Sequence, residues 1–341
     1  MEPDKIDWDN LGFNYIETKK MFVSDYKDGK WDEGNIVDFG PIKMNPAACV
    51  LNYGQGIFEG MKALRAKNGE IVLFRPEENA KRFNRSAERL LMPSFDEHKF
   101  IEAVKNVVIA NKEYIPPYES GGALYLRPLM FADGPILGVK PADKYKVIIF
   151  AVPVGPYFPE GFKGINLKIT KKYTRAAPGG TGDCKTICNY AGTMKPAKIV
   201  KEEGYAQVIY LDAVHKEYIE EVGTANFFAV IDGKLVTPAT KGTILEGINR
   251  KSVMKLAEEQ LGIIVEERDV SYKEIFESNC TEVFCAGTAA VITPIASVAF
   301  EDKKITYNEG KPGEITNKIF KLLTGIQRLE IEDYYNWVVK V

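Results

Sequence analysis

Residues 178–190 read Pro178-Gly179-Gly180-Thr181-Gly182-Asp183-Cys184-Lys185-Thr186-Ile187-Cys188-Asn189-Tyr190, the most informative stretch of the chain. Three glycines in four positions give a backbone that can bend tightly and approach a ligand closely. A lysine held on such a constrained loop can act as an amine nucleophile, because partial desolvation readily lowers its pKa. The alternative is a solvated surface lysine, and this stretch alone leaves both readings open.

The glycines fit neither of two common phosphate-binding motifs. A P-loop needs glycine directly before its lysine, and Cys184 occupies that place. The dinucleotide fingerprint needs its three glycines at a strand-to-helix turn, and no Gly-x-Gly-x-x-Gly fits here. Lys185 as a carbonyl-reactive amine therefore remains the hypothesis to test.

Composition and charge narrow the class of protein. At 341 residues the chain is long enough for two domains, and its 45% hydrophobic and 27% charged content is typical of globular proteins. The net charge of -2 comes without a basic stripe, so we expect no nucleic-acid partner. Small, neutral or weakly anionic ligands fit better.

The amino terminus and the cysteines bear on location. Residues 1–8 are acidic and lack an apolar run, unlike a signal or transit peptide. No apolar stretch approaches the ~18 residues that span a bilayer, and the five cysteines form no disulfide-like framework. We expect a cytoplasmic protein without membrane contact.

Histidine is scarce. His98 and His215 are the two histidines of the chain, far apart in sequence and in polar surroundings. Histidine-based zinc sites and Ser-His-Asp or Cys-His catalysis therefore have little to work with, and we expect no metal site. In an enzyme, the proton carrier would then be a lysine, a tyrosine or a carboxylate, or a cofactor would supply the difficult chemistry.

Periodicity and turn signals predict a mixed architecture in two domains. Asn68-Gly69 and Asp232-Gly233 mark hairpins, and Gly247 leads a helix. We expect strands at 20–45, 61–66, 71–75, 123–131, 145–152, 207–211, 226–231, 234–237, 263–267, 282–285, 292–300 and 304–307, and helices at 76–93, 100–108, 247–262, 272–277 and 314–329. The class is α+β, or mixed α/β, with a small domain at 1–159, an interdomain loop at 160–173 and a large domain at 174–341.

Three further segments complete what a pyridoxal-phosphate enzyme requires. Such an enzyme needs a carboxylate against the pyridinium nitrogen and a phosphate cradle, often at a helix start. Glu220-Glu221 lies at a strand-like end, 247–249 leads a helix, and 287–290 could add a hydroxyl and N–H groups. Each has an ordinary alternative as a solvated strand residue, a loop glycine or a turn cap. Their joint occurrence favours the functional interpretation.

The chain resembles the branched-chain amino-acid aminotransferases, pyridoxal-phosphate proteins of fold type IV (the D-amino-acid-aminotransferase-like fold), and most closely their longer, eukaryotic-like branch. The resemblance runs in collinear order over nearly the whole sequence. The blocks that carry it are 51–53, 58–63, 73–76, 124–128, 137–139, 153–159, 179–190, 221–226, 244–250 and 287–289.

The resemblance implies a role for each cofactor residue. Lys185 would bind pyridoxal 5'-phosphate covalently and shuttle the substrate proton, while Glu221 would keep the pyridine nitrogen protonated. The remaining cofactor contacts implied are Tyr190 on the phenolic oxygen, Arg82 and Thr288 on the phosphate, the backbone of Ile248 and Asn249 on the phosphate, and Thr224. Glu246, where relatives often have proline, would place a carboxylate near that phosphate.

The resemblance also implies the substrate pocket and a homodimer. The pocket residues implied are Phe13, Tyr53, Phe58, Tyr125, Tyr157, Thr224 and Ala289, with Arg127 beside Tyr53 and Tyr125 for the distal carboxylate of glutamate. Leu137 and Val139 would reach the site of the partner subunit. The implied activity is amino-group exchange between L-leucine, L-isoleucine or L-valine and 2-oxoglutarate by a ping-pong route.

Other functions remain as alternatives. A D-amino-acid transaminase or an aminodeoxychorismate lyase would share the fold, although both are usually shorter and lack the arrangement of 125–128. A non-catalytic protein that binds the cofactor, or a scaffold that binds none, comes from a different class. A visible spectrum and a substrate panel would separate them.

Overall fold

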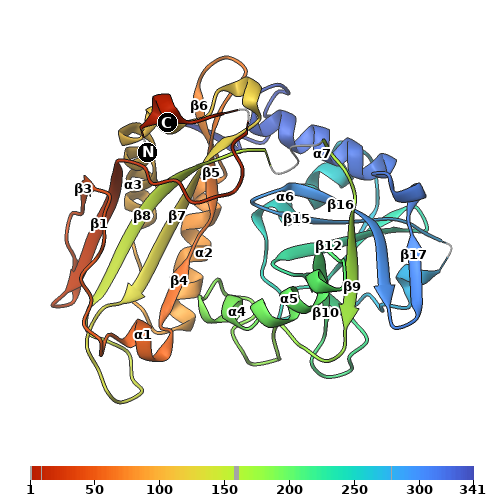
Figure 1. Cartoon of the computed structure of the whole chain (residues 1–341), viewed down its shortest axis with the longest axis horizontal. Helices are drawn as coiled ribbons and strands as arrows, with labels where there is room; N and C mark the ends of the chain where they lie inside the picture. Colours follow the sequence, from red (N-terminus) through yellow and green to blue (C-terminus); the bar gives the residue numbers. More distant parts are fainter. Residues whose placement is uncertain (1, 9, 157–160, 278) are drawn as a thin grey trace. The chain divides into compact units, whose positions relative to one another are not determined.

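A computed structural model describes residues 2–8, 10–156, 161–277 and 279–341. Its contacts divide the chain into two compact units, each a β-sheet with helices packed on it (Figure 1). Unit 1 comprises Met1–Pro159, Cys184–Cys188 and Ile326–Val341, and unit 2 comprises Glu160–Asp183 and Asn189–Gly325.

Unit 1 is built on a nine-stranded sheet whose described pairings are all antiparallel. Its main path runs β18-β6-β5-β7-β8-β1-β2, with β3 paired to β1 and β4 to β7. The strands are β1 (Lys20–Lys27), β2 (Lys30–Trp31), β3 (Asn35–Asp38), β4 (Gly56–Phe58), β5 (Met61–Arg65), β6 (Ile71–Phe74), β7 (Ala123–Ala132), β8 (Tyr145–Val154) and β18 (Val338–Lys340). The hairpin predicted at Asn68-Gly69 is confirmed, because Ala66 and Glu70 close it between β5 and β6.

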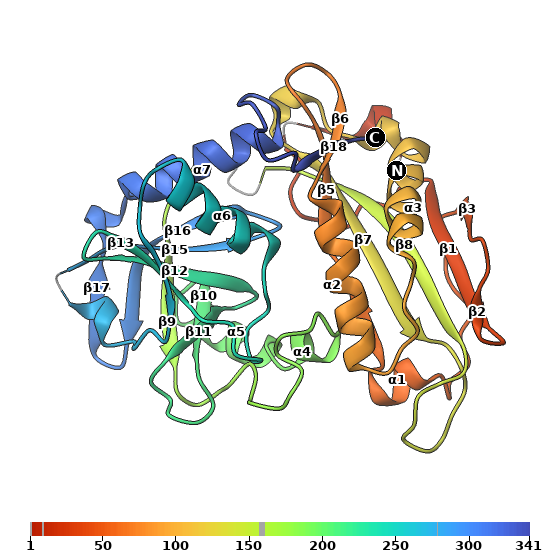
Figure 2. The same ribbon diagram turned by 180° about the vertical axis from the view of Figure 1, so that it is seen from behind.

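Two long helices cover the sheet of unit 1, as the view from behind shows (Figure 2). Helix α2 (Pro76–Arg89) begins with proline at its first turn, where no amide donor is lost. Helix α3 (Glu97–Ala110) begins at Asp96, whose side chain accepts from the amide of Lys99. Phe83 and Phe100, exposed by 1% and 0%, pack with their ring centroids 5.2 Å apart and join the two helices in one core. The shorter helical elements are α1 (Cys49–Tyr53) and the 3-10 turns η1 (Pro3–Lys5), η2 (Lys112–Tyr114) and η3 (Tyr118–Ser120).

Unit 2 is built on a second nine-stranded sheet of mixed direction. Its path runs β11-β10-β9-β16-β15-β12-β13-β14, with β17 paired to β16, and β9 lies parallel to both neighbours. The strands are β9 (Ile165–Thr170), β10 (Gln207–Leu211), β11 (Ile219–Val222), β12 (Ala225–Ile231), β13 (Lys234–Pro238), β14 (Val265–Arg268), β15 (Cys280–Gly287), β16 (Val291–Phe300) and β17 (Lys303–Thr306). The helical elements are α4 (Cys188–Ala191), α5 (Met194–Glu202), α6 (Ile248–Glu259), α7 (Glu314–Gln327), η4 (Glu274–Phe276) and η5 (Asn308–Gly310).

Four segments differ from expectation. The segment 160–173 contains strand β9, which pairs with two neighbours, so it is not only a loop. The helix expected at 272–277 is only the 3-10 turn η4, because the backbone is already extended at Glu277. The contacts also group residues 184–188 and 326–341 with unit 1, since the first pair with β4 and the second carry β18.

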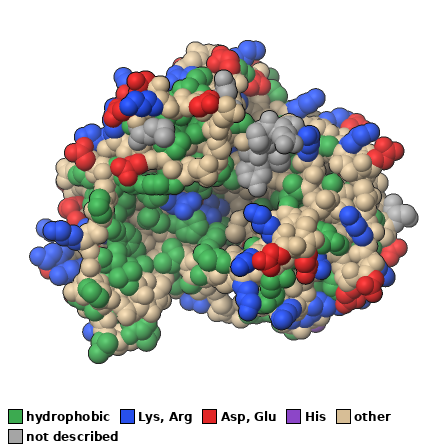
Figure 3. All heavy atoms as spheres, viewed as in Figure 1, with side chains coloured by type: hydrophobic (Ala, Val, Ile, Leu, Met, Phe, Trp, Pro, Cys, Tyr) green, Lys and Arg blue, Asp and Glu red, His purple; other side chains and the backbone are tan. Residues whose placement is uncertain are grey.

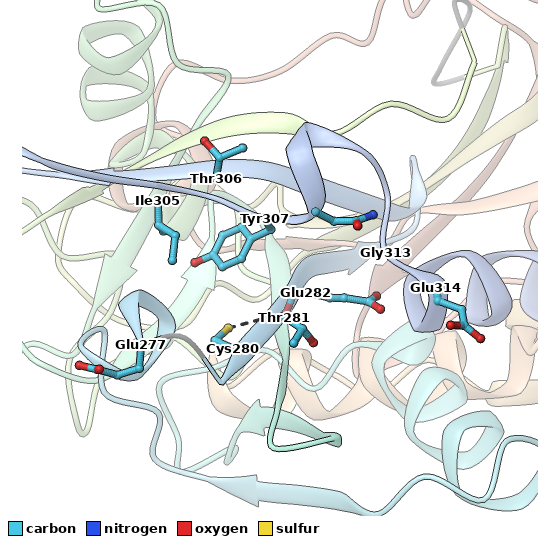
Figure 4. A pocket seen from close by; sticks show the side chains of 10 residues that line it. Glu277, Cys280, Thr281, Glu282, Ile305, Thr306, Tyr307, Gly313 and Glu314 are labelled. Carbon is cyan, nitrogen blue, oxygen red and sulfur yellow. Dashed lines mark hydrogen bonds between the residues drawn. The ribbon is translucent and has the colours of Figure 1, made fainter.

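Helix α7 begins against a buried carboxylate. Glu282 on β15 accepts from the amides of Ile315 and Thr316, at 3.0 and 2.8 Å, and from the Thr316 hydroxyl at 2.7 Å. Figure 4 shows this carboxylate directed toward the start of α7, in the wall of a cavity of about 510 Å³. A carboxylate that satisfies helix-start donors is a structural cap. None of the residues proposed from the sequence lines this cavity.

Candidate active site

Lys185 is held by a short segment of unit 1 that pairs with strand β4. The Phe58 amide donates to the Lys185 carbonyl, the Ile187 amide donates to the Gly56 carbonyl, both at 3.1 Å, and Ile57 and Thr186 form an antiparallel bridge. The Lys185 amide donates to the Ser86 hydroxyl of α2 at 2.9 Å. The backbone on both sides of this lysine is therefore fixed, which limits where its side chain can reach.

The Phe58 ring lies close to two cations. Lys185 Nζ is 4.7 Å from the ring centroid, and the Arg127 guanidinium is 4.8 Å from it. Arg127 also lies 5.3 Å from the centroid of the Tyr125 ring and donates from Nη2 to its hydroxyl at 3.3 Å. Phe13 completes this group, with its ring edge-on to Tyr125 at 6.0 Å. Five of the residues proposed from the sequence thus contact one another within unit 1, and the group combines apolar rings with positive charge.

Arg82 makes a buried bidentate pair with Glu59. Nε donates to Oε1 at 2.8 Å and Nη2 to Oε2 at 2.7 Å, and the two side chains are exposed by 5% and 0%. Asn79 adds a hydrogen bond to the same carboxylate at 2.7 Å. Arg82 and Ser86 are four residues apart on α2 and share a helix face. Helix α2 therefore presents the proposed phosphate ligand and the support of Lys185 on one side.

Lys62 is a cation of unit 1 that sequence reasoning did not single out. It lies opposite Tyr125 in the β5–β7 pairing. Burial of the amine, and secondarily the charge of Arg328, lowers the pKa of Lys62 to about 7. In the sequence, Lys62 could have been noticed because it lies four residues after Phe58, within the block 58–63 that carries the resemblance.

Tyr53, Leu137 and Val139 are further residues of unit 1 that were proposed from the sequence. Tyr53 is 41% exposed and donates from its hydroxyl to the Leu137 carbonyl, so it joins the loop of Leu137 and Val139, which are 90% and 86% exposed. Figure 3 shows hydrophobic side chains gathered on the face of unit 1 in view. Tyr157 lies outside the described residues.

Glu221 is the centre of a buried polar network in unit 2. It lies on β11 between Tyr210 of β10 and Asn226 of β12, and it is 2% exposed. Arg175 forms an ion pair with Oε2, and the Asn226 amide donates to Oε1 at 3.1 Å. Arg175 in turn donates to the carbonyls of Gly182 and Thr243, at 2.9 and 2.6 Å. A carboxylate fixed in this way is oriented and kept beside a positive charge.

Asn226 joins this network to the start of helix α6. Its amide also donates to the Leu245 carbonyl at 2.8 Å, and a Cβ added at Gly247 would collide with its Oδ1. Gly247 is the N-cap of α6, and no described side chain caps the helix there. The first amides of a helix without a side-chain cap favour an anion.

The proposed phosphate ligands of unit 2 meet at this helix start. The Asn249 side chain donates to the Gly287 carbonyl at 2.9 Å, which ties α6 to the loop of Thr288 and Ala289. Val291, at the end of that loop, has φ of 65°, a strained conformation for a β-branched residue. Glu246 forms an ion pair with Lys251 at 2.8 Å, so its carboxylate is balanced by a cation.

Tyr190 and Thr224 are the remaining proposed cofactor residues of unit 2. Tyr190 is half-buried on the short helix α4, and its carbonyl accepts from the Thr193 hydroxyl at 2.7 Å. Thr224 is exposed at the turn between β11 and β12. The proposed cofactor residues are thus divided, with Lys185 and Arg82 in unit 1 and the others in unit 2.

Sequence reasoning missed Glu59, Arg175 and Asn226, which hold the proposed residues in place. Each lies within or just before a recognised block, but only tertiary contacts reveal its partner. In the described ranges, no group of histidine, cysteine and acidic side chains is arranged to hold a metal ion. The helices of the described part also include none with the length and apolar content to cross a bilayer.

Comparisons with known proteins bear on the family and on the fold. The family model for amino-transferase class IV matches residues 56–298. Branched-chain-amino-acid aminotransferase 5 of Arabidopsis thaliana, named as chloroplastic, is 47% identical over 338 residues, covering 99% of this chain and 80% of that protein.

Solved structures share the fold. The branched-chain amino acid aminotransferase of Escherichia coli has a TM-score of 0.81 at 30% identity, with 94% of this chain and 99% of that one covered. The enzyme of Thermobaculum terrenum in its PLP form has a TM-score of 0.81 at 25% identity, covering 95% and 99%. The mixed α/β fold predicted from the sequence is confirmed. The chain belongs to the class IV aminotransferase family, and within it to the branched-chain amino-acid aminotransferases.

Proposed function

We propose that the protein transfers the amino group between L-leucine, L-isoleucine or L-valine and 2-oxoglutarate, with pyridoxal 5'-phosphate as cofactor. The observation that carries this proposal is the network of Glu221, Arg175 and Asn226 beside the uncapped start of helix α6. It offers a fixed carboxylate for a ring nitrogen and amides for a phosphate, within one unit. The PLP form of a solved relative at 25% identity supports the choice of cofactor.

When bound, the cofactor supplies an electron sink that lets a proton leave the α-carbon of the amino acid. The chain supplies the groups that hold it and move the proton. In the proposal, Glu221 keeps the ring nitrogen protonated and Tyr190 donates to the phenolic oxygen. The phosphate is bound by the amides of Ile248 and Asn249, by Thr288 and by Arg82; Thr224 borders the same ligand.

Lys185 is the proposed catalytic base. Its backbone is fixed by Phe58 and Ser86, so its Nζ can exchange a proton between two neighbouring carbons without the chain moving. A chain with two histidines needs such a carrier.

The Phe58 group fits the two kinds of substrate. Apolar rings favour aliphatic side chains, each worth roughly 1.5–3 kcal/mol on full burial, and Arg127 offers a cation for the distal carboxylate of glutamate. We assign five further residues to the same substrate pocket: Phe13, Tyr53, Tyr125, Tyr157 and Ala289.

We also propose a homodimer, in which the loop of Leu137 and Val139 reaches the partner's site. Their exposure of 90% and 86% is unusual for aliphatic side chains and supports a contact with another surface. A cytoplasmic location is proposed because the five cysteines are all free thiols, as in a reducing compartment.

A visible spectrum and a substrate panel test the proposal. Purified protein with pyridoxal phosphate should show a yellow band that L-leucine removes and 2-oxoglutarate restores. Lys185→Ala should lower the turnover rate at least 10³-fold, on the order of the contribution of an acid–base group. Lys198→Ala, on the exposed side of α5, is the control and should leave the turnover rate unchanged. The proposal would be overturned if Lys185→Ala retained turnover, or if D-alanine removed the yellow band and L-leucine did not.

A further inference from the structure

A second cavity of unit 2 is lined by a buried acid that the proposed reaction does not use. Its volume is about 240 Å³, several times the ~30 Å³ that one water occupies in the liquid. Residues from the ends of β11 and β13 and from the loop after β10 line it, among them Val214, His215, Glu220, Pro238 and Ile244. Apolar side chains share the wall with acidic ones and with Lys241 and Thr243.

Glu220 is the residue that distinguishes this cavity. The pairing of β11 with β10 shifts at Glu220, which is left as an extra residue between Ile219 and Glu221. Glu220 lines the cavity, whereas Glu221 does not and meets Arg175 and Asn226 instead. It is 5% exposed, and no group among the described residues donates to its Oε2. Burial raises the pKa of Glu220, while a hydrogen bond from Thr243 and the charge of Arg175 act in the opposite direction. A buried carboxylate oxygen without a donor is costly, which calls for a donor inside the cavity.

The other acids of the wall already have partners. Asp212 accepts from the amides of His215, Glu217 and Tyr218, at 2.5, 3.0 and 2.9 Å, and so organises its own loop. Asp269 pairs with Lys241 at 2.8 Å. Within the described wall, Glu220 is thus the acid with unused capacity, and a positively charged donor matches it best.

We propose that this cavity binds a small alkylammonium group, with an N–H donating to Oε2 of Glu220 and the alkyl part against Val214, Pro238 and Ile244. Two sources share that chemistry: simple amines, and the ammonium end of a free aliphatic amino acid. The site is distinct from the proposed catalytic residues, because none of those lines it. It does not depend on the proposed reaction.

The two histidines make the test selective. His215 lines the cavity and His98 lies on α3 of unit 1, so the ring signals of histidine-labelled holoenzyme report on the cavity and on a control site at once. The probes are N,N-dimethylisobutylammonium, which has one N–H and cannot form a Schiff base, and its trimethyl analogue, which has none. L-leucine forms a third arm that separates amino acids from simple amines.

Saturable movement of the His215 signals with the first probe, with His98 unmoved, is the expected result. Glu220→Gln keeps the shape of the side chain and should weaken binding roughly tenfold to a hundredfold, the range for a lost charge-assisted hydrogen bond. Glu203→Gln, outside the wall, is the matched control. Ala239→Leu should block the cavity while leaving Glu220 in place, which covers the case in which Glu220→Gln misfolds.

Three results would overturn the proposal. His215 could stay unmoved at saturating probe, which would mean that water alone meets Glu220. The trimethyl analogue could bind as well as the dimethyl probe, which would mean that no N–H is needed. Glu220→Gln and Ala239→Leu could both bind the dimethyl probe with the affinity of the wild type. Loss of transaminase activity would bear on the proposed function and not on this cavity, so the two can fail separately.

Discussion

Arg175 should be required both for the stability of unit 2 and for cofactor binding, through the single carboxylate of Glu221. Arg175→Met removes the cation of a buried pair whose side chains are exposed by only 6% and 3%, while its aliphatic length is kept. The carbonyls of Gly182 and Thr243 lose their donor at the same time.

The magnitude follows from what is left behind. Removing one partner of a buried pair costs about 3–5 kcal/mol, because the other charge stays buried without compensation. In a Glu221→Gln background the same change costs only the two carbonyl hydrogen bonds, about 1 kcal/mol each. The double-mutant cycle should therefore show a coupling of about 1–3 kcal/mol between Arg175 and Glu221.

Chemical denaturation of the four apoproteins measures this coupling, and titration with pyridoxal phosphate measures its consequence for the site. Arg175→Met should bind the cofactor more weakly, with an altered visible band. Additive stability changes, with a coupling below about 0.5 kcal/mol, would refute the reasoning from the buried pair. Unchanged cofactor affinity would refute the link to the site.

Three other changes have defined outcomes. Burial lowers the pKa of Lys62 to about 7, below the ~10.4 of a lysine in an unfolded chain. Between these two pH values the unfolded state binds more protons, so the free energy of unfolding should rise with pH by up to about 1.4 kcal/mol per pH unit. Lys62→Met should flatten this rise in denaturation curves measured at pH 7.5 and 8.5, and a slope equal to that of the wild type would contradict the prediction. Glu282→Ala should lower the free energy of unfolding by about 2–3 kcal/mol by uncapping α7, and Glu282→Gln by less; thermal melts that match the wild type would exclude the cap. Gly247→Ala places a Cβ against Asn226 and should weaken pyridoxal phosphate binding roughly 5- to 10-fold, the effect of about one lost hydrogen bond. A fluorescence titration measures this affinity, and Gly192→Ala is the control, because open space surrounds Gly192.

Much of the fold was predictable because its signals are local. Asn68-Gly69 and Asp232-Gly233 form the predicted hairpins, and the latter pair both have positive φ, of 51° and 74°. The bounds of strand β11 were not predicted. All four of its residues are buried, but two of them are glutamates, so the strand lacks the hydrophobic pattern of a buried strand. A helix at 272–277 was a wrong expectation, since the backbone makes one 3-10 turn at Glu274–Phe276 and is extended from Glu277.

The proposed site was predictable as a list of residues but not as a set of partners. Lys185 and Glu221 were chosen from blocks of sequence, whereas Arg175 became visible only when its guanidinium reached a carboxylate 46 positions away along the printed sequence. Glu59 and Arg82 are similar, since a bidentate pair across 23 positions depends on how α2 packs on β4. Tertiary packing decides such pairs, and a single sequence carries no record of it.

The path of the chain between its two units has a consequence for how this protein can be divided. The backbone passes from one unit to the other after residues 159, 183, 188 and 325. A single cut near 160 would leave the first fragment without the strand that closes the edge of its sheet beside β6 and without the segment that carries Lys185. Neither half is a contiguous piece of gene, so this fold is poorly suited to shuffling by recombination and to split-protein complementation. Permuted termini, placed in an exposed loop, are the better route to dissecting it.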